Sequence, residues 1–256
     1  MKWDALIMAA GRGPDDPMAK AYGVSHKCLL EVGGIPMLAR VVDVLSRHKS
    51  IRRIFISIED ETLIKKALGR DAEHVEFMRS GDSAAASALL ALGSGKLTHP
   101  ILLTTADHAL LTPEMVSNFL GASEAVKADL TVGLARAETI LKAYPNAKRT
   151  FLKFGRDRVS GCNLYGLKNA NTARVLEFWR TVEQDRKSPL KLMRAFGPRL
   201  LLAWATGLTS LNGAFRLASK RLGVTAVPVL MRQANAAVDV DKPADKELVE
   251  RILAVN

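Results

Sequence analysis

Several features are scarce in this 256-residue chain, and each scarcity excludes a class of protein. The two cysteines, Cys28 and Cys162, lie far apart and form no C-x-x-C pair, so we expect reduced thiols in a cytoplasmic protein. Aromatic residues make up only 5% of the chain and form no RNP-type motif, so nucleic acid is not an expected partner. No apolar run reaches the roughly 18 residues of a membrane-spanning helix, and none near Lys2 resembles a secretion signal.

Repeats, low-complexity tracts and obvious linkers are also lacking, which favours one domain over residues 1–256. The hydrophobic content of 48% is sufficient for a large core. Charge is unevenly distributed: residues 142–232 contain 18 Lys and Arg but four Asp and Glu, a net +14, which leaves −3 elsewhere. An anionic partner for this basic half is one interpretation, and solvated faces of surface helices are the other.

Apolar segments alternate with amphipathic ones through the first half of the chain. Strands are predicted at residues 6–9, 52–58, 74–79, 100–107 and 128–135, and helices are predicted from Pro36, Asp60, Ser83 and Thr112. This alternation is typical of a three-layer α/β fold, in which a mostly parallel central sheet is covered by helices on both faces.

The pattern changes in the second half. The predicted elements are strands at 149–154, 158–167, 224–231 and 236–241, with helices from Asn169 or Asn171 and from Pro243. Gly197-Pro198 must divide the long basic and apolar stretch between them. In residues 185–235, Lys and Arg border Phe, Trp and Leu, a composition that can lie on an anionic bilayer or bury one face in the core.

The segment LIMAAGRGP, residues 6–14, is a strand that stops at two glycines. A dinucleotide fingerprint would need a third glycine where Asp16 stands, and no Gly-Lys-Ser/Thr follows to form a Walker A loop. What remains is Gly11, Gly13 and a polar loop that leads to Lys27. A tight turn would explain the glycines, and so would backbone N–H groups that approach a phosphate.

Together, LIMAAGRG and HKCLLEVGGIPMLARVVDVL resemble the opening of the MobA-like nucleotidyltransferases, which have a GT-A-type α/β fold. The matching residues are Gly11, Gly13, Lys27, Gly34 and Pro36. Two positions depart from the family's pattern. The arginine expected after the glycine pair is missing, and His26 stands where proline usually precedes the lysine. Arg12 or Lys20 could replace the missing arginine.

The resemblance implies a nucleotide site and a set of catalytic residues. The implied nucleotide-binding residues are Ala9, Ala10, Gly11, Gly13, Lys27, Gly81, Ser83 and Ser87, and the implied catalytic residues are Lys27, Arg12 and Lys153. The family's base-binding loop corresponds to the segment with Gly81, Ser83 and Ser87, although Asp82 or Ser83 could simply cap an alanine-rich helix. Gly161 and Asn163 match its acceptor strand, and Lys153 is a candidate for the acceptor phosphate. A buried amide and a solvated lysine are the alternatives.

Three acidic residues are candidate metal ligands. Asp107 is the last residue of the fourth predicted strand, at the edge where α/β sheets bind ligands, and matches the aspartate with which the family holds Mg²⁺. An Asx turn would also explain Asp107. In AAVDVD, either Asp239 or Asp241 matches the second ligand; on a strand they would point to opposite sides, and we favour Asp241. One or two carboxylates suffice for Mg²⁺ beside phosphate oxygens and water.

The expected function is therefore Mg²⁺-dependent transfer of NMP from an NTP to a phosphorylated acceptor, with release of pyrophosphate. CTP is preferred over GTP as the donor, and the acceptor is a small molecule or is lipid-linked. We expect a nucleotide-binding part at 1–135, a basic acceptor-binding part at 136–236 and a closing strand and helix at 237–256. Contact with the inner face of an anionic membrane would involve 185–235.

Two other functions remain open. A GT-A-type glycosyltransferase would bind a nucleotide-sugar, but it usually carries D-x-D after a central strand, and ADH supplies one acid. A non-catalytic nucleotide or nucleic-acid binding protein would fit the missing arginine and the basic half. Release of pyrophosphate distinguishes the transferase from such a binding protein.

Overall fold

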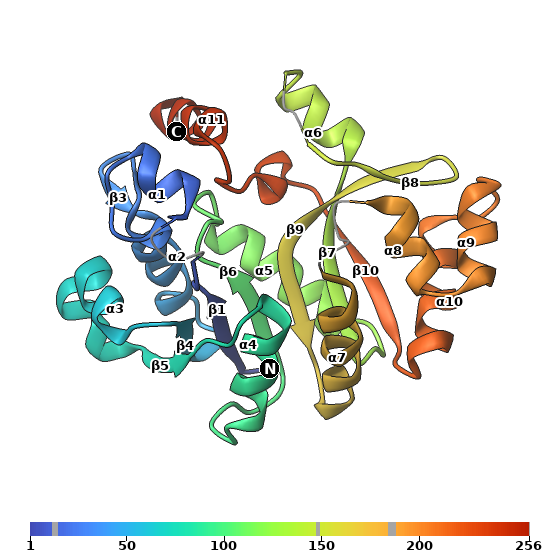
Figure 1. The fold of residues 1–256 in the computed structure, drawn as a ribbon, viewed down its shortest axis with the longest axis horizontal. Helices are drawn as coiled ribbons and strands as arrows, with labels where there is room; N and C mark the ends of the chain where they lie inside the picture. The colour runs from blue at the N-terminus through green and yellow to red at the C-terminus, as the bar shows by residue number, and fades with distance from the viewer. Residues whose placement is uncertain (12–14, 147–148, 184–187, 256) are drawn as a thin grey trace.

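A mostly parallel sheet forms the centre of the molecule in the computed structural model, which describes residues 1–11, 15–146, 149–183 and 188–255 (Figure 1). Its strands are β1 (Trp3–Met8), β4 (Ile51–Ile58), β5 (Glu76–Arg79), β6 (Ile101–Thr105), β7 (Leu130–Arg136), β8 (Leu152–Phe154), β9 (Asp157–Leu167) and β10 (Ala226–Met231). The order is β10-β7-β9-β6-β1-β4-β5, with β8 paired to β9. Only β9 runs antiparallel to the strands beside it, β6, β7 and β8. The predicted α/β class is confirmed.

Helices cover both faces of this sheet because its strands are apolar on both sides. On β1, Ile7 packs in the cluster that contains residues of α2 (Met37–Ser46), α3 (Glu61–Leu68) and α5 (Pro113–Glu124). The next side chain toward the N-terminus, Leu6, packs in a second cluster with α4 (Ala84–Gly93) and α7 (Ala173–Val182). Alternate residues of one strand therefore hold the two helical layers in place.

The remaining elements lie around this three-layer core. They are the helices α1 (Pro17–Ala21), α6 (Ala137–Ala143), α8 (Pro189–Ala195), α9 (Pro198–Ala205), α10 (Leu211–Leu222) and α11 (Pro243–Val255), the short 3₁₀ turns η2 (Lys27–Leu29), η3 (Gly69–His74), η4 (Ala170–Thr172) and η6 (Ala234–Ala237), and the hairpin of β2 (Glu31–Val32) and β3 (Ile35–Pro36). Among the described residues, no helix is long and apolar enough to cross a membrane.

The basic stretch divides where its sequence predicts. Gly197 has a φ of 102° between α8 and α9, and Pro198 begins α9. The helices α8, α9 and α10 have their own apolar cluster, in which Leu200 and Leu211 pack against Phe154 and Val159. They lie together at one end of the molecule (orange in Figure 1).

One predicted strand does not form, and one predicted helix begins a residue later than expected. Residues 236–241 do not form a strand: η6 ends at Ala237, and the segment then runs without a partner strand. Its N–H groups find other acceptors, since Val240 donates to the carbonyl of Asp107. Pro36 precedes the helix as its N-cap, because its own backbone pairs with Glu31 in the hairpin.

Candidate active site

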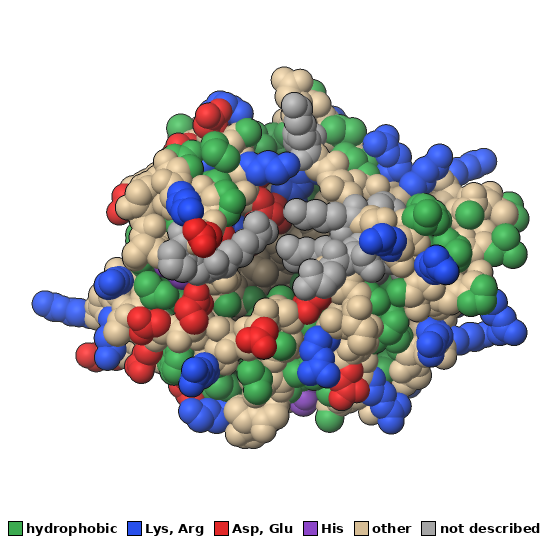
Figure 2. Space-filling view, in the orientation of Figure 1, with side chains coloured by type: hydrophobic (Ala, Val, Ile, Leu, Met, Phe, Trp, Pro, Cys, Tyr) green, Lys and Arg blue, Asp and Glu red, His purple; other side chains and the backbone are tan. Residues whose placement is uncertain are grey.

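A cleft of about 600 Å³ opens at the carboxyl edge of the sheet. Its lining includes Ala10 and Gly11 after β1, Lys27 of η2 and Asp107 after β6. The turn before α4 and Asp241 also belong to the lining, as do the start of α1 and Glu183. Figure 2 shows the hollow in this face of the molecule. The volume is within the range of pockets that hold a small ligand, and this edge is where open α/β sheets bind them.

Lys27 lies between two carboxylates at the mouth of this cleft. Its ammonium donates to Asp107 Oδ2 at 2.7 Å and to Asp241 Oδ1 at 2.8 Å. Thr105 donates to the other oxygen of Asp107 at 2.6 Å. Burial alone would lower the pKa of Lys27, but the attraction of Asp107 and Asp241 outweighs it and raises the pKa above its usual value. The lysine is therefore positively charged at neutral pH.

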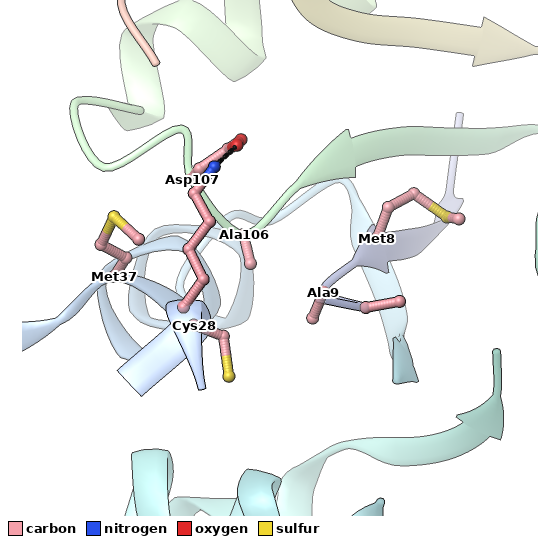
Figure 3. Close-up of a pocket in the computed structure, with 8 residues that line it drawn as sticks. Met8, Ala9, Cys28, Met37, Ala106 and Asp107 are labelled. Carbon is pink, nitrogen blue, oxygen red and sulfur yellow. Dashed lines mark hydrogen bonds and ion pairs between the residues drawn. The ribbon is translucent and has the colours of Figure 1, made fainter. Parts of the chain in front are cut away.

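Behind these groups lies a smaller pocket of about 60 Å³, which Figure 3 shows. Ala9 and Ala106 line it with Met8, Cys28 and Met37, and the Asp107 carboxylate lies on the side away from Cys28 (Figure 3). Small side chains at the ends of β1 and β6 thus leave room beside the carboxylate.

Asp239 has different partners from Asp241. It forms an ion pair with Arg149 and accepts a hydrogen bond from Asn163 Nδ2 at 3.1 Å. Burial raises the pKa of Asp239, and the nearby carboxylates of Asp107 and Asp241 raise it further, while Arg149 lowers it. Asn163 has a φ of 50°, at the irregular part of the β7–β9 pairing. Both oxygens of Asp239 are thus occupied within the protein.

The glycine turn is held by a histidine and a glutamate. The N–H of Gly11 donates to the Glu59 carboxylate at 3.3 Å, and His26 Nε2 lies 2.9 Å from the same carboxylate. A Cβ on Gly11 would lie 2.5 Å from His26 Nε2, and Gly11 has no positive φ. The glycine is therefore required by the approach of the imidazole rather than by a left-handed turn.

In the turn before α4, backbone N–H groups donate hydrogen bonds largely to serine side chains of the same segment. Ser83 caps the helix by accepting from Ala86 N at 3.1 Å, and Ser87 Oγ accepts from Gly81 N at 2.9 Å. Glu183, at the end of α7, accepts from Ala85 N at 3.3 Å. Gly81 packs closely on Ala86, where a Cβ would lie 3.0 Å away. Both serines line the cleft while they stabilise the turn.

Most of the predicted residues meet at this edge, and some do not. Lys153 and Gly161 are exposed on β8 and β9 and do not line the cleft. Asn163 reaches the site through Asp239. Arg12 and Gly13 lie outside the described residues, so their predicted roles stay predictions.

Four other contributors are not identified by the sequence analysis. Glu59 directly follows β4, so the rule that ligands bind at carboxyl ends of parallel strands could have found it. Thr105 stands two residues before Asp107, a spacing typical of a local hydrogen bond. Arg149 and Glu183 lie in segments without a motif, and only the fold brings them to the site.

A cation site formed by this chain alone is not evident. Among the described residues, no group of three or more His, Cys, Asp and Glu side chains could hold a metal ion. His108, beside Asp107, is buried, and burial lowers its pKa to about 4. Its ring is therefore neutral and adds no positive charge. Asp107 and Asp241 remain the pair of carboxylates that face a shared cationic group.

Comparison with known proteins gives the same fold. A model of the MobA-like NTP transferase domain matches residues 5–144. A structure described as a hypothetical transferase from Thermus thermophilus has a TM-score of 0.78 at 26% identity, over 96% of this chain and 100% of that one. None of the curated proteins matches the sequence.

Two more distant structures are a synthetase complexed with CTP and a cytidylyltransferase. CMP-2-keto-3-deoxy-manno-octonic acid synthetase complexed with CTP has a TM-score of 0.61 at 13% identity, over 100% of this chain and 99% of that one. The 2-C-methyl-D-erythritol 4-phosphate cytidylyltransferase from Thermus thermophilus has a TM-score of 0.56 at 15% identity, over 99% of this chain and 100% of that one. At these identities the likeness establishes the GT-A-like fold.

Proposed function

Since the chain belongs to the MobA-like NTP transferase family, a family of nucleotidyltransferases, we propose that it transfers NMP from an NTP to a phosphorylated acceptor. The observation that carries this proposal is the charged group at the cleft, where Lys27 lies between Asp107 and Asp241. The acceptor's phosphate oxygen attacks the α-phosphorus in line, the bond from that phosphorus to the bridging oxygen breaks, and pyrophosphate leaves with the bonding electrons. A phosphate is already an anion at neutral pH, so no covalent intermediate on the enzyme is needed.

Mg²⁺ is the expected cofactor of this reaction. The two carboxylates fit it because they already hold a cationic group, the Lys27 ammonium, at 2.7 and 2.8 Å. With phosphate oxygens and water, Asp107 and Asp241 are a sufficient pair of protein ligands. When bound, the ion supplies positive charge that stabilises the phosphates. Asp239 instead orients Arg149, in this proposal, because its oxygens are already engaged.

Lys27 stabilises negative charge on the nucleotide phosphates. Its pKa is raised, so its charge is retained, and Asp107 holds the amine where it lines the cleft. Ala9, Ala10 and the turn at Gly11 leave space beside the lysine for the phosphates. A fixed positive charge aimed at developing negative charge contributes more in a partly closed site than in water.

CTP is the favoured donor, and GTP is second. The synthetase complexed with CTP and the cytidylyltransferase that share this fold support that order. The turn with Gly81, Ser83 and Ser87 borders the cleft, and we assign the base to it. The acceptor lies toward β9, near Asn163 and Gly161, with Lys153 and Arg149 as candidate phosphate contacts.

The first experiment measures pyrophosphate release and thermal stabilisation with CTP, GTP, ATP and UTP, each with and without Mg²⁺. One NTP should stabilise the protein in proportion to its affinity, and the Mg²⁺-dependent part should disappear in Asp107→Ala. The control is Asp43→Ala, at a carboxylate on α2 that pairs with Arg47 outside the cleft. Stabilisation by nucleotide-sugars alone would favour a glycosyltransferase. Binding of nucleotides without release of pyrophosphate from the NTP, whichever sugar phosphate or alditol phosphate is added as the acceptor, would favour the non-catalytic binder.

The basic segment of residues 185–235 is proposed to contact an anionic membrane surface. Between Asp185 and Asp239 the sequence contains no acidic residue. Leu190, Leu202 and Leu208 are exposed by 58%, 67% and 85%, and in Figure 2 green and blue side chains cover the region of α8 to α10. Exposed leucines among basic residues fit a surface that offers both negative charge and apolar depth.

Sedimentation with vesicles tests this contact. Vesicles with phosphatidylglycerol should bind the protein, and pure phosphatidylcholine vesicles should bind it much less. Leu202→Ser with Leu208→Ser should weaken binding about tenfold, whereas Leu90→Ser, at a leucine exposed by 56% on α4, should not. Equal binding to both vesicle types, or none to either, would contradict the contact.

A further inference from the structure

Both ring nitrogens of His26 make polar contacts, which together join the two turns of the nucleotide site. Its Nδ1 accepts from the backbone N–H of Cys28 at 3.1 Å, which caps the η2 turn that carries Lys27, and it also lies 3.0 Å from Cys28 Sγ. Its Nε2 lies 2.9 Å from the Glu59 carboxylate, which in turn accepts the N–H of Gly11. Because Nδ1 accepts, the ring proton lies on Nε2 and is donated to Glu59.

The imidazole is also in direct contact with the glycine turn. His26 is only 4% exposed, and its Nε2 occupies the place that a side chain on residue 11 would need. At the position where the MobA-like pattern has proline, this chain therefore has a side chain that connects Gly11 to Lys27. A proline ring restricts its own backbone but cannot make these two contacts.

We propose that His26, acting with Glu59, is a positioning residue that fixes the glycine turn relative to Lys27. This inference rests on the proposed function for its consequence, which is the placement of the triphosphate. The pair of His26 and Glu59, which we call the brace, also occupies the Gly11 N–H, because that N–H donates to Glu59. The phosphates are therefore bound by Lys27 and by groups other than this N–H. Errors of about 1 Å in such placement are sufficient to slow an enzyme about a hundredfold.

The two contacts can be removed separately. In His26→Asn the amide oxygen can replace Nδ1 at Cys28 but the side chain is too short for Glu59, whereas in His26→Gln the amide nitrogen can replace Nε2 but nothing caps Cys28. His48 provides a matched control outside the cleft. Its Nδ1 accepts from Ser50 N, also two residues on, and its Nε2 contacts Ser117.

Transfer kinetics with the preferred NTP form the first readout. We expect kcat/KM to fall at least about tenfold in both His26 variants and in Glu59→Ala, with Glu59→Gln close to wild type because its amide oxygen can still accept. The corresponding His48 variants should lose a similar amount of stability and keep kcat/KM within about twofold. Unchanged kinetics in the His26 variants, or an equal loss in the His48 variants, would overturn the proposal.

Amide exchange of Gly11 in the ligand-free protein is the second readout, and it is independent of transfer. Exchange should be faster in His26→Asn and Glu59→Ala than in wild type, and unchanged in His26→Gln and the His48 variants. If wild type releases no pyrophosphate from any NTP, the proposed function fails, and this readout alone judges the brace. Unchanged exchange of the Gly11 amide in both His26→Asn and Glu59→Ala would then overturn the proposal.

Discussion

The two edges of the central sheet each hold a charged triplet, and the triplets have opposite compositions. At the carboxyl edge one ammonium, Lys27, lies between the carboxylates of Asp107 and Asp241. At the amino edge the order is reversed: the carboxylate of Asp4, on β1, lies between two guanidinium groups, those of Arg52 and Arg53 on β4.

Access distinguishes the two triplets. Asp4 is completely buried, accepts a further hydrogen bond from Thr98 N at 2.7 Å, and lines neither of the two cavities at the opposite edge. Lys27 lines the cleft, and the side chain of Asp241 is 56% exposed. The buried triplet of Asp4 thus stabilises the fold, because both of its carboxylate oxygens accept hydrogen bonds. The triplet of Lys27 has similar charge pairing but opens to a cavity, and it therefore forms a candidate site.

The largest expected effect is on catalysis at the carboxyl edge. Lys27→Met should lower kcat/KM by about a hundredfold or more, because the positive charge next to the phosphates is removed. The free energy of unfolding, measured in urea, should change much less, because water can hydrate the exposed carboxylate of Asp241 once the ammonium is removed. Lys65→Met, at an exposed lysine of α3, is the control for kinetics and stability. A kcat/KM within about twofold of wild type would remove Lys27 from the site.

The amino edge should give the opposite result. Asp4→Asn should lower the free energy of unfolding by about 3 kcal/mol, because it leaves two guanidinium groups without their carboxylate. Nucleotide affinity, measured by titration calorimetry, should stay within about twofold. Asp43→Asn should cost less than about 0.5 kcal/mol, since that carboxylate is 51% exposed and pairs with Arg47 along one helix. A loss of affinity in Asp4→Asn would break the comparison.

The pH dependence of stability should differ in sign between the edges. Burial alone would raise the pKa of Asp4, but its hydrogen bonds from Arg53, Arg52 and Thr98 lower it below 3.8. Its stabilisation is present above pH 3.8 and is lost as the pH falls through its folded-state pKa. The stability gap between wild type and Asp4→Asn should therefore narrow in acid.

Lys27 behaves in the reverse way, because its pKa is raised above 10.5 in the folded protein. Its stabilisation is present below pH 10.5 and is lost only in stronger base. Both contributions are measured by unfolding wild type, Asp4→Asn and Lys27→Met in urea at acid and alkaline pH and comparing their free energies of unfolding. A gap for Asp4→Asn that stays constant through acid would contradict the assigned pKa shift.

The smallest expected effect concerns Asp241, the exposed carboxylate of the triplet around Lys27. Asp241→Asn should change the free energy of unfolding by less than about 1 kcal/mol, because partly exposed ion pairs contribute little. It should still reduce the Mg²⁺-dependent part of the nucleotide-induced thermal shift. The matching Asp239→Asn should leave that part in place, and loss of it there would exchange the roles of the two aspartates.

Local signals were sufficient for much of the fold. The Thr112 cap with Pro113, the break at Gly197-Pro198 and the alternation of Leu6 and Ile7 are each encoded within a few residues. The strand predicted at 236–241 is wrong because two alternating valines also fit an extended segment that packs its apolar side chains without a neighbouring strand. Periodicity reports burial of side chains but does not identify hydrogen-bond partners.

For the site, the sequence by itself determined the chemistry at hand: glycines after a first strand, Lys27, and acids near two later element ends, in a pattern of the MobA-like family. Only the tertiary structure decided which acid shares Lys27 with Asp107, and that His26 and Glu59 hold Gly11. These pairings join residues 33 to 214 positions apart. Contacts of that separation depend on how strands and loops pack in space, which no local pattern records.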